Sequence, residues 1–512
     1  MHQIAFLLNL NALLSRSNLL YPVLAVHLVL RCAVALLSTL GNDEVYYTLY
    51  AKELDWSYFD HPPMVGALIY SSTFANFWLN EFSVRLGALL IGTLNLYLIY
   101  HITKRLGNHY AANIALLLSC TSFYVAIISG TFIMPDTPLT LFWLLSLYFF
   151  LQVIQRKRSV DFLLFGICSG LALFSKYHGI YLWGAAGLYV LMWDRTLLKN
   201  SYLYLALLLS AVVFIPVILW NLESPFSGLS YHENRVGSDS LLPNFKFFFQ
   251  EVFGQFFYNN PFVVFLCFFA LVATLRKRSA LNKTSGFLTL TALPLLVSTI
   301  VLSMYNRTLP HWSGPAYFGL IVLAALYWEK NKDSKKLHFS LKGSKIFFLL
   351  VILLGLFQIQ TGLILGKSIS TVEKQGKKDF TVDLSQWKRI GTALSNELPD
   401  RSVIITHNWF PAAHLDFYFA RKQDSKVYVS GTREKKHQFL KINQSQGAID
   451  SNQPIFYVTT SHYFNSPSPR IDSLFQRSNT PVIFPIKQWG KTKVNVFYWK
   501  LNPKKTVAPD EL

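Results

Sequence analysis

Charged residues are scarce in this chain: only 14% of its 512 residues are Asp, Glu, Lys or Arg, whereas 52% are hydrophobic and 16% are aromatic. Soluble proteins average about 25% charged residues. So few charges cannot cover a water-facing surface of this size. Intrinsic disorder is excluded as well, because disordered segments are rich in charge and poor in apolar side chains. The composition therefore predicts a membrane protein.

Cysteine is also rare, and all four residues fall in apolar runs that we expect to lie in the membrane: Cys32, Cys120, Cys168 and Cys267. This placement excludes a secreted disulfide scaffold and predicts no structural disulfide. The chain lacks a Walker motif, a glycine-rich dinucleotide loop and an internal repeat. Its formal net charge is +20, but most of that charge lies between or beyond the apolar runs, so we expect no nucleic-acid partner.

Apolar runs long enough to cross about 30 Å of hydrocarbon recur throughout the first 366 residues. We expect about eleven membrane spans, two of which, 162–174 and 178–193, are short and are therefore tilted, re-entrant or extended into their flanks. The run 4–14 is too short to span and is predicted to be an interfacial helix. The predicted spans are 19–40, 84–103, 109–128, 137–154, 162–174, 178–193, 201–220, 260–275, 285–304, 313–328 and 344–366.

Basic residues are unevenly distributed among the loops between these spans. One alternate set of loops carries eighteen basic and four acidic residues, whereas the opposite set carries six basic and eleven acidic residues. Loops rich in Lys and Arg stay in the cytoplasm. This parity predicts a multi-pass protein of the cell (inner) membrane with a cytoplasmic N-terminus and an extracytoplasmic, periplasmic C-terminal segment.

The segment 367–512 differs in texture, because polar residues and turn signals separate short apolar runs. The pattern indicates an α/β domain with its own core, distinct from a membrane domain at 1–366. Predicted strands are 402–406, 426–430, 454–460, 481–487 and 494–501, and predicted helices are 384–398, 411–422, 433–443 and 469–477.

Ionisable residues of the helical half gather where spans meet the predicted outer loops, including the long loop 41–83, and suggest one polar site. An unpaired charge beside hydrocarbon costs several kcal/mol, which favours a functional role for Asp43, Asp136 and Lys176 over simple loop polarity. For the stretch 231–235 (YHENR) both interpretations stay open. Arg31, within the first span, is expected to be a structural residue paired inside the bundle. The candidates are Asp43, Glu44, Asp60, His61, Asp136, Lys176, Tyr177, Arg307 and His311.

Four of these features form a combined pattern: an acidic pair after the first span, YFDHPPM in the first outer loop, MPDTP in the second, and FSKYHG at the next outer junction. Over residues 19 to about 330 this pattern resembles the membrane-integral GT-C glycosyltransferases, in particular protein O-mannosyltransferases and lipid A aminoarabinose transferases. The C-terminal segment resembles them only in general plan. The resemblance implies a mainly α fold, a polytopic membrane helical bundle of the GT-C type with a C-terminal extracytoplasmic α/β domain.

The resemblance also implies roles for individual residues. Asp43 takes the place of the catalytic acid of the first outer loop, with Glu44 completing the pair. Asp136 corresponds to the Asp of the second loop, and Lys176 to a Lys that contacts the lipid phosphate. His61 departs from the aminoarabinose enzymes, which have Lys there, and a neutral imidazole neutralises phosphate less well than an ammonium group. The sugar is therefore left open, and the span count departs from the thirteen of those enzymes.

Chemistry outside the cytoplasm excludes nucleotide-sugar donors, so the expected donor is a polyprenyl-phosphate-linked sugar. Lys176, Arg307 or protonated His61 would stabilise the leaving phosphate. Asp43 would take the proton of an acceptor hydroxyl in a single displacement with inversion, or would orient an acceptor that is itself a phosphate. The expected partners are this donor, membrane lipids and an acceptor lipid, envelope glycan or protein.

Two other classes stay open, a lipid-glycan ligase or polymerase and a flippase or transporter of lipid-linked sugars. The first would use an outer-loop Arg or His pair without the two Asp residues; the second would place charges or broken helices near the membrane midplane. We expect no cofactor. A metal is not expected either, because the possible ligands, Asp60, His61, His232 and His311, lack a diagnostic spacing on one helix.

Three tryptophans carry further expectations. Trp409 lies in the motif HNWF, which follows a predicted strand and opens a helix, where open α/β sheets often bind ligands. Acceptor selection by Trp409 and simple packing against the membrane half both remain open. Trp143 and Trp312 are expected in the aromatic belts at the membrane interface.

Overall fold

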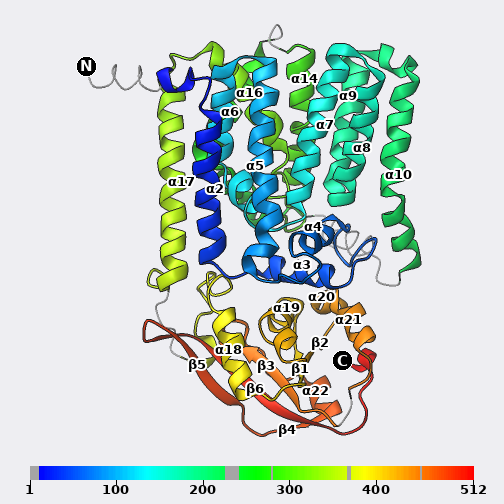
Figure 1. The fold of residues 1–512 in the computed structure, drawn as a ribbon, viewed down its shortest axis with the longest axis vertical. Coiled ribbons are helices and arrows are strands. Elements are labelled where there is room, and N and C mark those ends of the chain that lie inside the picture. The colour runs from blue at the N-terminus through cyan, green and yellow to red at the C-terminus, as the bar shows by residue number, and fades with distance from the viewer. Residues whose placement is uncertain (1–10, 225–241, 278–280, 366–370, 450–451) are drawn as a thin grey trace.

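A computed structural model describes residues 11–224, 242–277, 281–365, 371–449 and 452–512. An upright helical bundle forms one part, and a unit of helices and a sheet, made by the C-terminal segment, lies against one end of it (Figure 1). Helices α3 (Asn42–Lys52) and α4 (Met64–Ser72) lie at the end of the bundle that meets this unit. The predicted interfacial helix 4–14 falls mostly outside the described residues.

The bundle confirms a mainly helical polytopic protein. Of the helices within the described ranges, six are long and apolar enough to cross a membrane, or seven if α12 and α13, bent by 105°, form one span. The helices are α2 (Leu20–Leu37), α5 (Glu81–Leu106), α6 (His109–Thr121), α7 (Asp136–Arg156), α8 (Ser159–Ser175), α9 (Ile180–Trp193), α10 (Ser201–Glu223), α12 (Phe245–Asn259), α13 (Pro261–Arg276), α14 (Lys283–Leu290), α15 (Leu293–Ser303), α16 (Ala316–Lys330) and α17 (Lys335–Thr361).

Each of the eleven predicted spans contains a helix. Only six or seven of the described helices, however, are long and apolar enough to cross a membrane by themselves. Five of the runs form helices of 13 to 17 residues, namely α6, α8, α9, α13 and α16. The run 109–128 is not one helix, because α6 ends at Thr121 and a π-helical turn occupies Tyr124–Ile128. Hydropathy alone does not reveal such breaks, since the residues on both sides are equally apolar.

Helix ends follow local chemistry. The side chain of Asn80 accepts hydrogen bonds from the backbone N–H groups of Phe82 and Ser83, which satisfies two donors at the start of α5. Asn108 caps α6 in the same way by accepting from Ala111. Gly362, with φ of +60°, ends α17 in the left-handed conformation that favours glycine.

A buried ion pair joins several helices at the end of the bundle that meets the C-terminal unit. The Arg85 guanidinium donates to both carboxylate oxygens of Glu44, at 2.7 and 2.5 Å. It also donates to the carbonyls of Ala35, Ser38 and Thr39 at the end of α2, at 2.8 to 3.0 Å. Both charged side chains are almost completely buried. The pair therefore links α2, α3 and α5 at one point, which we call the Arg85–Glu44 hub.

Arg31, predicted to be a structural residue because it lies within the first span, is bonded inside the bundle. It donates to the carbonyl of Gly130 at 2.7 Å and to Thr93 Oγ1 at 2.6 Å, and is fully buried. A Cβ on Gly92 would lie 2.2 Å from the Arg31 guanidinium and 2.6 Å from the Gly130 backbone. Glycine is therefore required at position 92 for the segment before α7 to approach α5 so closely.

The C-terminal segment forms a six-stranded mixed sheet in the order β2-β1-β3-β6-β4, with β5 also paired to β6. Strands β2, β1 and β3 are parallel, and β6 runs antiparallel to β3, β4 and β5. This confirms a mixed α/β unit. The strands are β1 (Val403–Thr406), β2 (Lys426–Val429), β3 (Ile455–Thr460), β4 (Phe475–Arg477), β5 (Val482–Gln488) and β6 (Lys491–Pro503).

The helices of this unit are α18 (Trp387–Glu397), α19 (Trp409–Tyr418), α20 (Arg433–Lys436), α21 (Phe439–Gln446) and α22 (Pro469–Leu474). All five predicted strands and the four helical regions are present, but the predicted helix 469–477 is wrong at its end, where β4 begins. Alternate residues point to opposite faces of the sheet. Ile404 and Val458 share a core with α3 and α4, whereas Val403 and Tyr457 pack on the other face.

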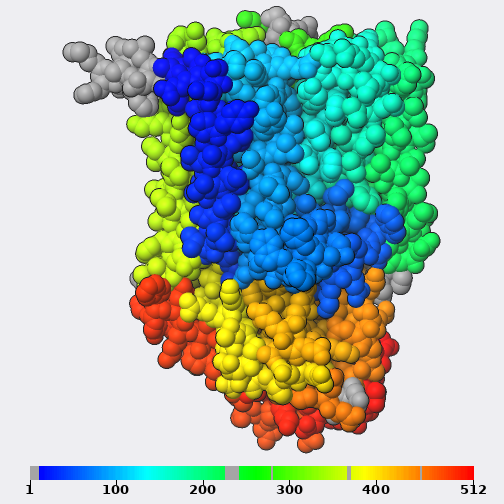
Figure 2. Space-filling model, in the orientation of Figure 1, coloured from blue at the N-terminus to red at the C-terminus, as the bar shows by residue number. Residues whose placement is uncertain are grey.

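The sheet unit is docked firmly on α3. Helix α19 packs along α3, and Asn42 donates to Asp383 at 3.1 Å while its side-chain oxygen lies 2.9 Å from the His414 ring. At the other end of α3, Lys52 pairs with Asp416 at 3.5 Å. The space-filling view shows segments from the N-terminal part of the chain, in blue, lying directly against the C-terminal unit (Figure 2). The division at residue 366 therefore stays a prediction about domains, since the core continues across it.

We expect Arg85→Met to lower the free energy of unfolding by about 3–5 kcal/mol, because it leaves the Glu44 carboxylate buried without its partner. The measurement is denaturant unfolding of the purified protein in detergent. The matched control is Asp424→Asn, which removes one partner of an exposed ion pair and should change stability by less than about 1 kcal/mol. Equal effects of both variants would contradict the importance of the hub.

Candidate active site

One large cavity, of about 980 Å³, opens where α3, the adjoining end of the bundle and the C-terminal unit meet. Its walls come from six separate parts of the chain: α3, the loop 53–63, the start of α7, the junction of α8 and α9, α15 with the loop after it, and the C-terminal unit. The lining side chains discussed below are Asp43, Tyr47, Asp60, His61, Asp136, Lys176, Tyr177, Ile180, Tyr181, Leu295, Ser298, Leu302, His311, Trp312, Trp409 and His437.

Seven of the nine residues predicted from sequence line this single cavity: Asp43, Asp60, His61, Asp136, Lys176, Tyr177 and His311. Arg307 does not; it is exposed on the loop after α15. The exposed position of Arg307 therefore does not support the prediction that it contacts the donor phosphate. The stretch 231–235, with His232, lies outside the described residues.

Glu44 is the second residue that the structure places elsewhere. Its carboxylate accepts from Arg85, from the Gly41 backbone at 2.9 Å and from the Ile133 backbone at 3.1 Å. Glu44 is therefore used to hold α3 against the segment that precedes α7, and it does not line the cavity. This position gives no support to a catalytic pair of Glu44 with Asp43, which stays a prediction.

Asp43 faces the cavity from the first turn of α3. Successive helix residues point about 100° apart, so Glu44 is directed to the hub while its neighbour Asp43 is directed to the cavity. Tyr47 lies one turn further on the same face and lines the cavity as well. The hub thus fixes the rotation of α3 and, with it, the direction of the Asp43 carboxylate.

Asp136 and Lys176 form a buried ion pair at the cavity wall. Lys176 Nζ lies 2.7 Å from Asp136 Oδ2, and Tyr124 donates its hydroxyl to Asp136 Oδ1 at 3.0 Å. Asp136 is the first residue of α7, where the helix dipole stabilises a negative charge. Lys176 follows the last residue of α8 in an extended conformation. The two residues predicted separately are therefore one unit.

Asp60 is held by a cluster of aromatic residues. It accepts hydrogen bonds from Tyr46 at 3.2 Å and from Tyr50, and its Oδ2 lies 3.8 Å from His437 Nδ1. Burial alone would raise the pKa of Asp60, but the neighbouring His61 and His437 rings and the Tyr50 hydroxyl hold that pKa well below its ordinary value. Asp60 is thus an anion over the physiological range.

The C-terminal unit supplies two side chains to the cavity, Trp409 and His437. Trp409 is the first residue of α19, which Asn408 caps, and its ring stacks on His437 at 4.9 Å. His437 has φ of +48°, an uncommon conformation for this residue, and the Phe59 ring also lies 4.9 Å from its ring. Sequence analysis singled out Trp409 but missed His437, for which no local signal exists.

The remaining wall is apolar and belongs to the membrane half. It includes Ile180 on α9 and Leu295 and Leu302 on α15, and Tyr181 and Ser298 join the two helices through hydroxyls 2.6 Å apart. The cavity is therefore amphipathic, with charged side chains in one part and apolar side chains beside them. Trp143 is fully buried in the bundle core, so its expected place in an interfacial belt is wrong. Trp312 lines the cavity, and its place in such a belt stays a prediction.

Metal ligation has no clear basis in this cavity. Among the described residues, no group of three or more His, Cys, Asp and Glu side chains is arranged to hold a metal ion.

Comparison with known proteins agrees with this geometry. The family described as dolichyl-phosphate-mannose-protein mannosyltransferase matches residues 60–220. The chain is 22% identical over 412 residues to the lipid A galacturonosyltransferase RgtD of Rhizobium johnstonii, which covers 76% of this chain and 79% of that protein.

Among solved structures, the fold is similar to that of ArnT from Cupriavidus metallidurans bound to undecaprenyl phosphate. The TM-score is 0.65 at 16% identity, over 93% of this chain and 97% of that one. ArnT in the apo state gives a TM-score of 0.61 at 17% identity, with the same coverage.

These findings confirm the resemblance inferred from the sequence. The chain has an ArnT-like fold and is similar in sequence to membrane glycosyltransferases of the GT-C type.

We expect Trp409→Ala to impair use of the acceptor while binding of the donor lipid persists, because Trp409 enters the cavity from the side opposite to the apolar wall. The measurement compares donor-lipid binding with transfer at varied acceptor concentration. Trp489→Ala, at an exposed tryptophan of the same unit, is the control and should leave both unchanged. Loss of donor binding alone in Trp409→Ala would count against an acceptor-side position.

Proposed function

We propose that this enzyme transfers a sugar from a polyprenyl phosphate to a lipid A-type acceptor at the outer face of the cell membrane. The observation that carries this proposal is the amphipathic cavity, in which acids and a lysine lie directly beside an apolar wall built by α9 and α15. A polyprenyl chain suits that wall, and a phosphate suits the charged end. RgtD, whose name specifies lipid A, supports the choice of acceptor class.

In the proposed mechanism, the acceptor oxygen attacks the anomeric carbon as the bond from that carbon to the phosphate oxygen breaks, with inversion. Asp43 takes the proton of an acceptor hydroxyl, or orients the acceptor where it is a phosphate that needs no base. The electron pair leaves with the phosphate. Lys176 stabilises the resulting negative charge on the phosphate, since Asp136 uses only one of its three N–H donors. Protonated His61 stabilises the same charge.

Asp136 holds Lys176 in place, and its negative charge balances the positive charge of Lys176 before the donor binds. Without the carboxylate, the ammonium group would be buried alone at a cost of several kcal/mol. Asp60, His437 and Trp409 form the opposite wall, where the proposal places the acceptor. Tyr177 and His311 add to the polar lining of the cavity.

The alternatives make different demands on structure. A flippase or transporter would need its charged groups near the midplane, whereas these lie at the ends of α7 and α8. A lipid-glycan ligase or polymerase would use the same compartment but would not need Asp43 and Asp136 together. Mass analysis of lipid A, envelope glycans and exported proteins from cells with and without the protein distinguishes these acceptors.

We propose that all eleven apolar runs enter the membrane, which places the N-terminus in the cytoplasm and the C-terminal unit outside. The short helices α6, α8, α9 and α16 stand among the long ones in the bundle (Figure 1), which supports this count. Reporter fusions after Lys283 and after Leu512 should report opposite sides of the membrane. If both reported the same side, the topology would be wrong.

We expect Asp43→Asn to reduce turnover by roughly 10²-fold or more with the fold intact, because the amide keeps the size of the side chain but loses its proton affinity. Asp136→Asn should act similarly if both outer loops serve one site. Lys176→Ala should chiefly weaken donor binding, since it removes the charge assigned to the lipid phosphate. The measurement is sugar transfer by purified protein, with kcat and KM determined separately.

The exposed Asp424→Asn variant is the matched control for these substitutions and should transfer at the normal rate. A well-folded Asp43→Asn protein with normal turnover would refute the catalytic assignment. Normal activity of both Asp variants would favour the transporter alternative.

A further inference from the structure

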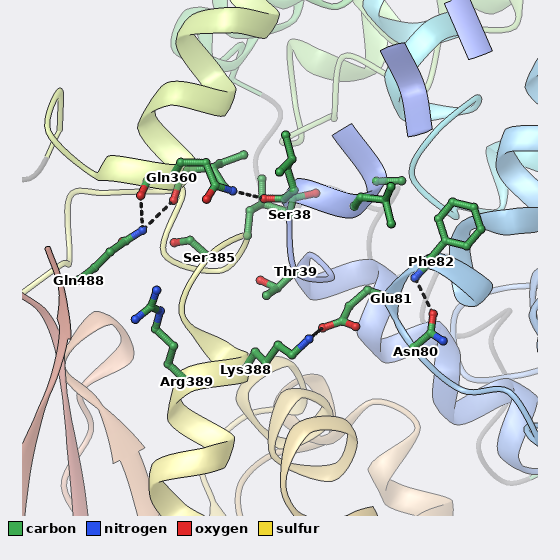
Figure 3. A pocket seen from close by; sticks show the side chains of 15 residues that line it. Ser38, Thr39, Asn80, Glu81, Phe82, Gln360, Ser385, Lys388, Arg389 and Gln488 are labelled. Carbon is green, nitrogen blue, oxygen red and sulfur yellow. Dashed lines mark hydrogen bonds and ion pairs between the residues drawn. The ribbon is translucent and has the colours of Figure 1, made fainter. Parts of the chain in front are cut away.

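A second hollow, of about 380 Å³, lies apart from the active site at the junction of the bundle and the C-terminal unit (Figure 3). The outer ends of α2 and α17 and the start of α5 form its membrane side. Helix α18 and the end of β5 form the opposite side. It shares no lining residue with the active-site cavity.

The hollow borders the ends of three long apolar helices, which is where lipid headgroups are expected. Helices α2, α5 and α17 are three of the long apolar spans, so their outer ends mark the boundary of the hydrocarbon. Leu36 and Leu37 are exposed in the last turn of α2 and line the hollow. Trp489, 77% exposed on the neighbouring turn, donates its ring N–H to the Gln360 carbonyl at 2.9 Å. An exposed tryptophan of this kind is typical of the membrane interface.

The rim of the hollow is preorganised by amide side chains. Gln360 donates to the Leu37 carbonyl at 2.6 Å, which joins the ends of α17 and α2. Gln488 donates to the carbonyls of Ile359 and Gln360, and itself accepts from Gln386 at 2.7 Å. These bonds satisfy carbonyls at the end of α17 and hold β5 against it, so the shape of the hollow does not depend on a ligand.

Two adjacent cations, Lys388 and Arg389, reach into this space from the first turn of α18 (Figure 3). Glu81 is the single acid in the lining and lies 3.6 Å from Lys388, which is 65% exposed, so their attraction is weak. Arg389 uses one donor, to the Lys487 carbonyl at 3.4 Å. The remaining donors, together with the positive end of the α18 dipole, favour an anion with several oxygen acceptors.

We propose that this hollow binds the phosphodiester headgroup of an anionic phospholipid from the outer leaflet, with the acyl chains lying along the ends of α2 and α17. Lys388 and Arg389 contact the phosphate, and Leu36 and Leu37 contact the start of the chains. The site is independent of sugar transfer and requires no assumption about the sugar donor or its acceptor.

The test is native mass spectrometry of the purified full-length protein, titrated with phosphatidylglycerol or with phosphatidylcholine of the same acyl chains. We expect phosphatidylglycerol to bind wild type about 10-fold or more tightly than it binds Lys388→Gln/Arg389→Gln, since each basic side chain at a lipid surface contributes roughly a factor of five. The control, Lys377→Gln/Lys378→Gln, removes the same charge from an exposed adjacent pair and should bind like wild type. Glu81→Gln should bind several-fold more tightly.

The expected increase in Glu81→Gln guards against misfolding, which could only weaken binding. Equal binding of phosphatidylglycerol by wild type and the Lys388/Arg389 variant would overturn the proposal, as would an equal loss in the control. Preference for phosphatidylcholine would also overturn it. Displacement of the lipid by millimolar inorganic phosphate would assign the hollow to free phosphate and reject a lipid headgroup.

Discussion

The buried pair of Arg85 and Glu44 is the interaction on which the end of the bundle beside the C-terminal unit depends. A guanidinium presents five donors in a fixed plane, and here they meet a carboxylate and the last carbonyls of α2. This one interaction gives hydrogen-bond donors to backbone carbonyls at the end of α2, neutralises a buried acid, and joins α2, α3 and α5. Glu44 extends it to the Ile133 backbone, close to the start of α7. The geometry of two outer loops follows from this point.

The shape of the candidate active-site cavity follows from the position of the Arg85–Glu44 hub. Asp43 is directed into the cavity because its neighbour is held elsewhere, and Asp136 begins a helix whose preceding segment is bonded to Glu44. The close approach of Gly92 and Gly130 around Arg31 fixes the same segment from the membrane side. The charged groups therefore stand on rigid elements at the end of an apolar wall, a placement suited to a lipid with a charged head.

The C-terminal unit helps to build the candidate site. Its core is continuous with that of α3 and α4, and it contributes Trp409 and His437 to the cavity. The strained backbone of His437 persists because Phe59 and Trp409 hold its ring on both sides. The same docking creates the second hollow, since α18 and β5 must approach the ends of α2 and α17 to support α19 on α3.

The sequence by itself determined the membrane character, the positions of the helical runs, the strands of the C-terminal unit and seven residues of the cavity. These follow from local properties: the length of an apolar run, a period of two residues in strands, and charges placed beside hydrocarbon. The tertiary structure alone decided that Asp43 faces the cavity while Glu44 does not, that Arg307 lies outside it, and that His437 reaches it. Adjacent acids are chemically alike, and only packing against Arg85 gives them different directions; His437 and Asp60, nearly four hundred positions apart, meet only because α19 docks on α3.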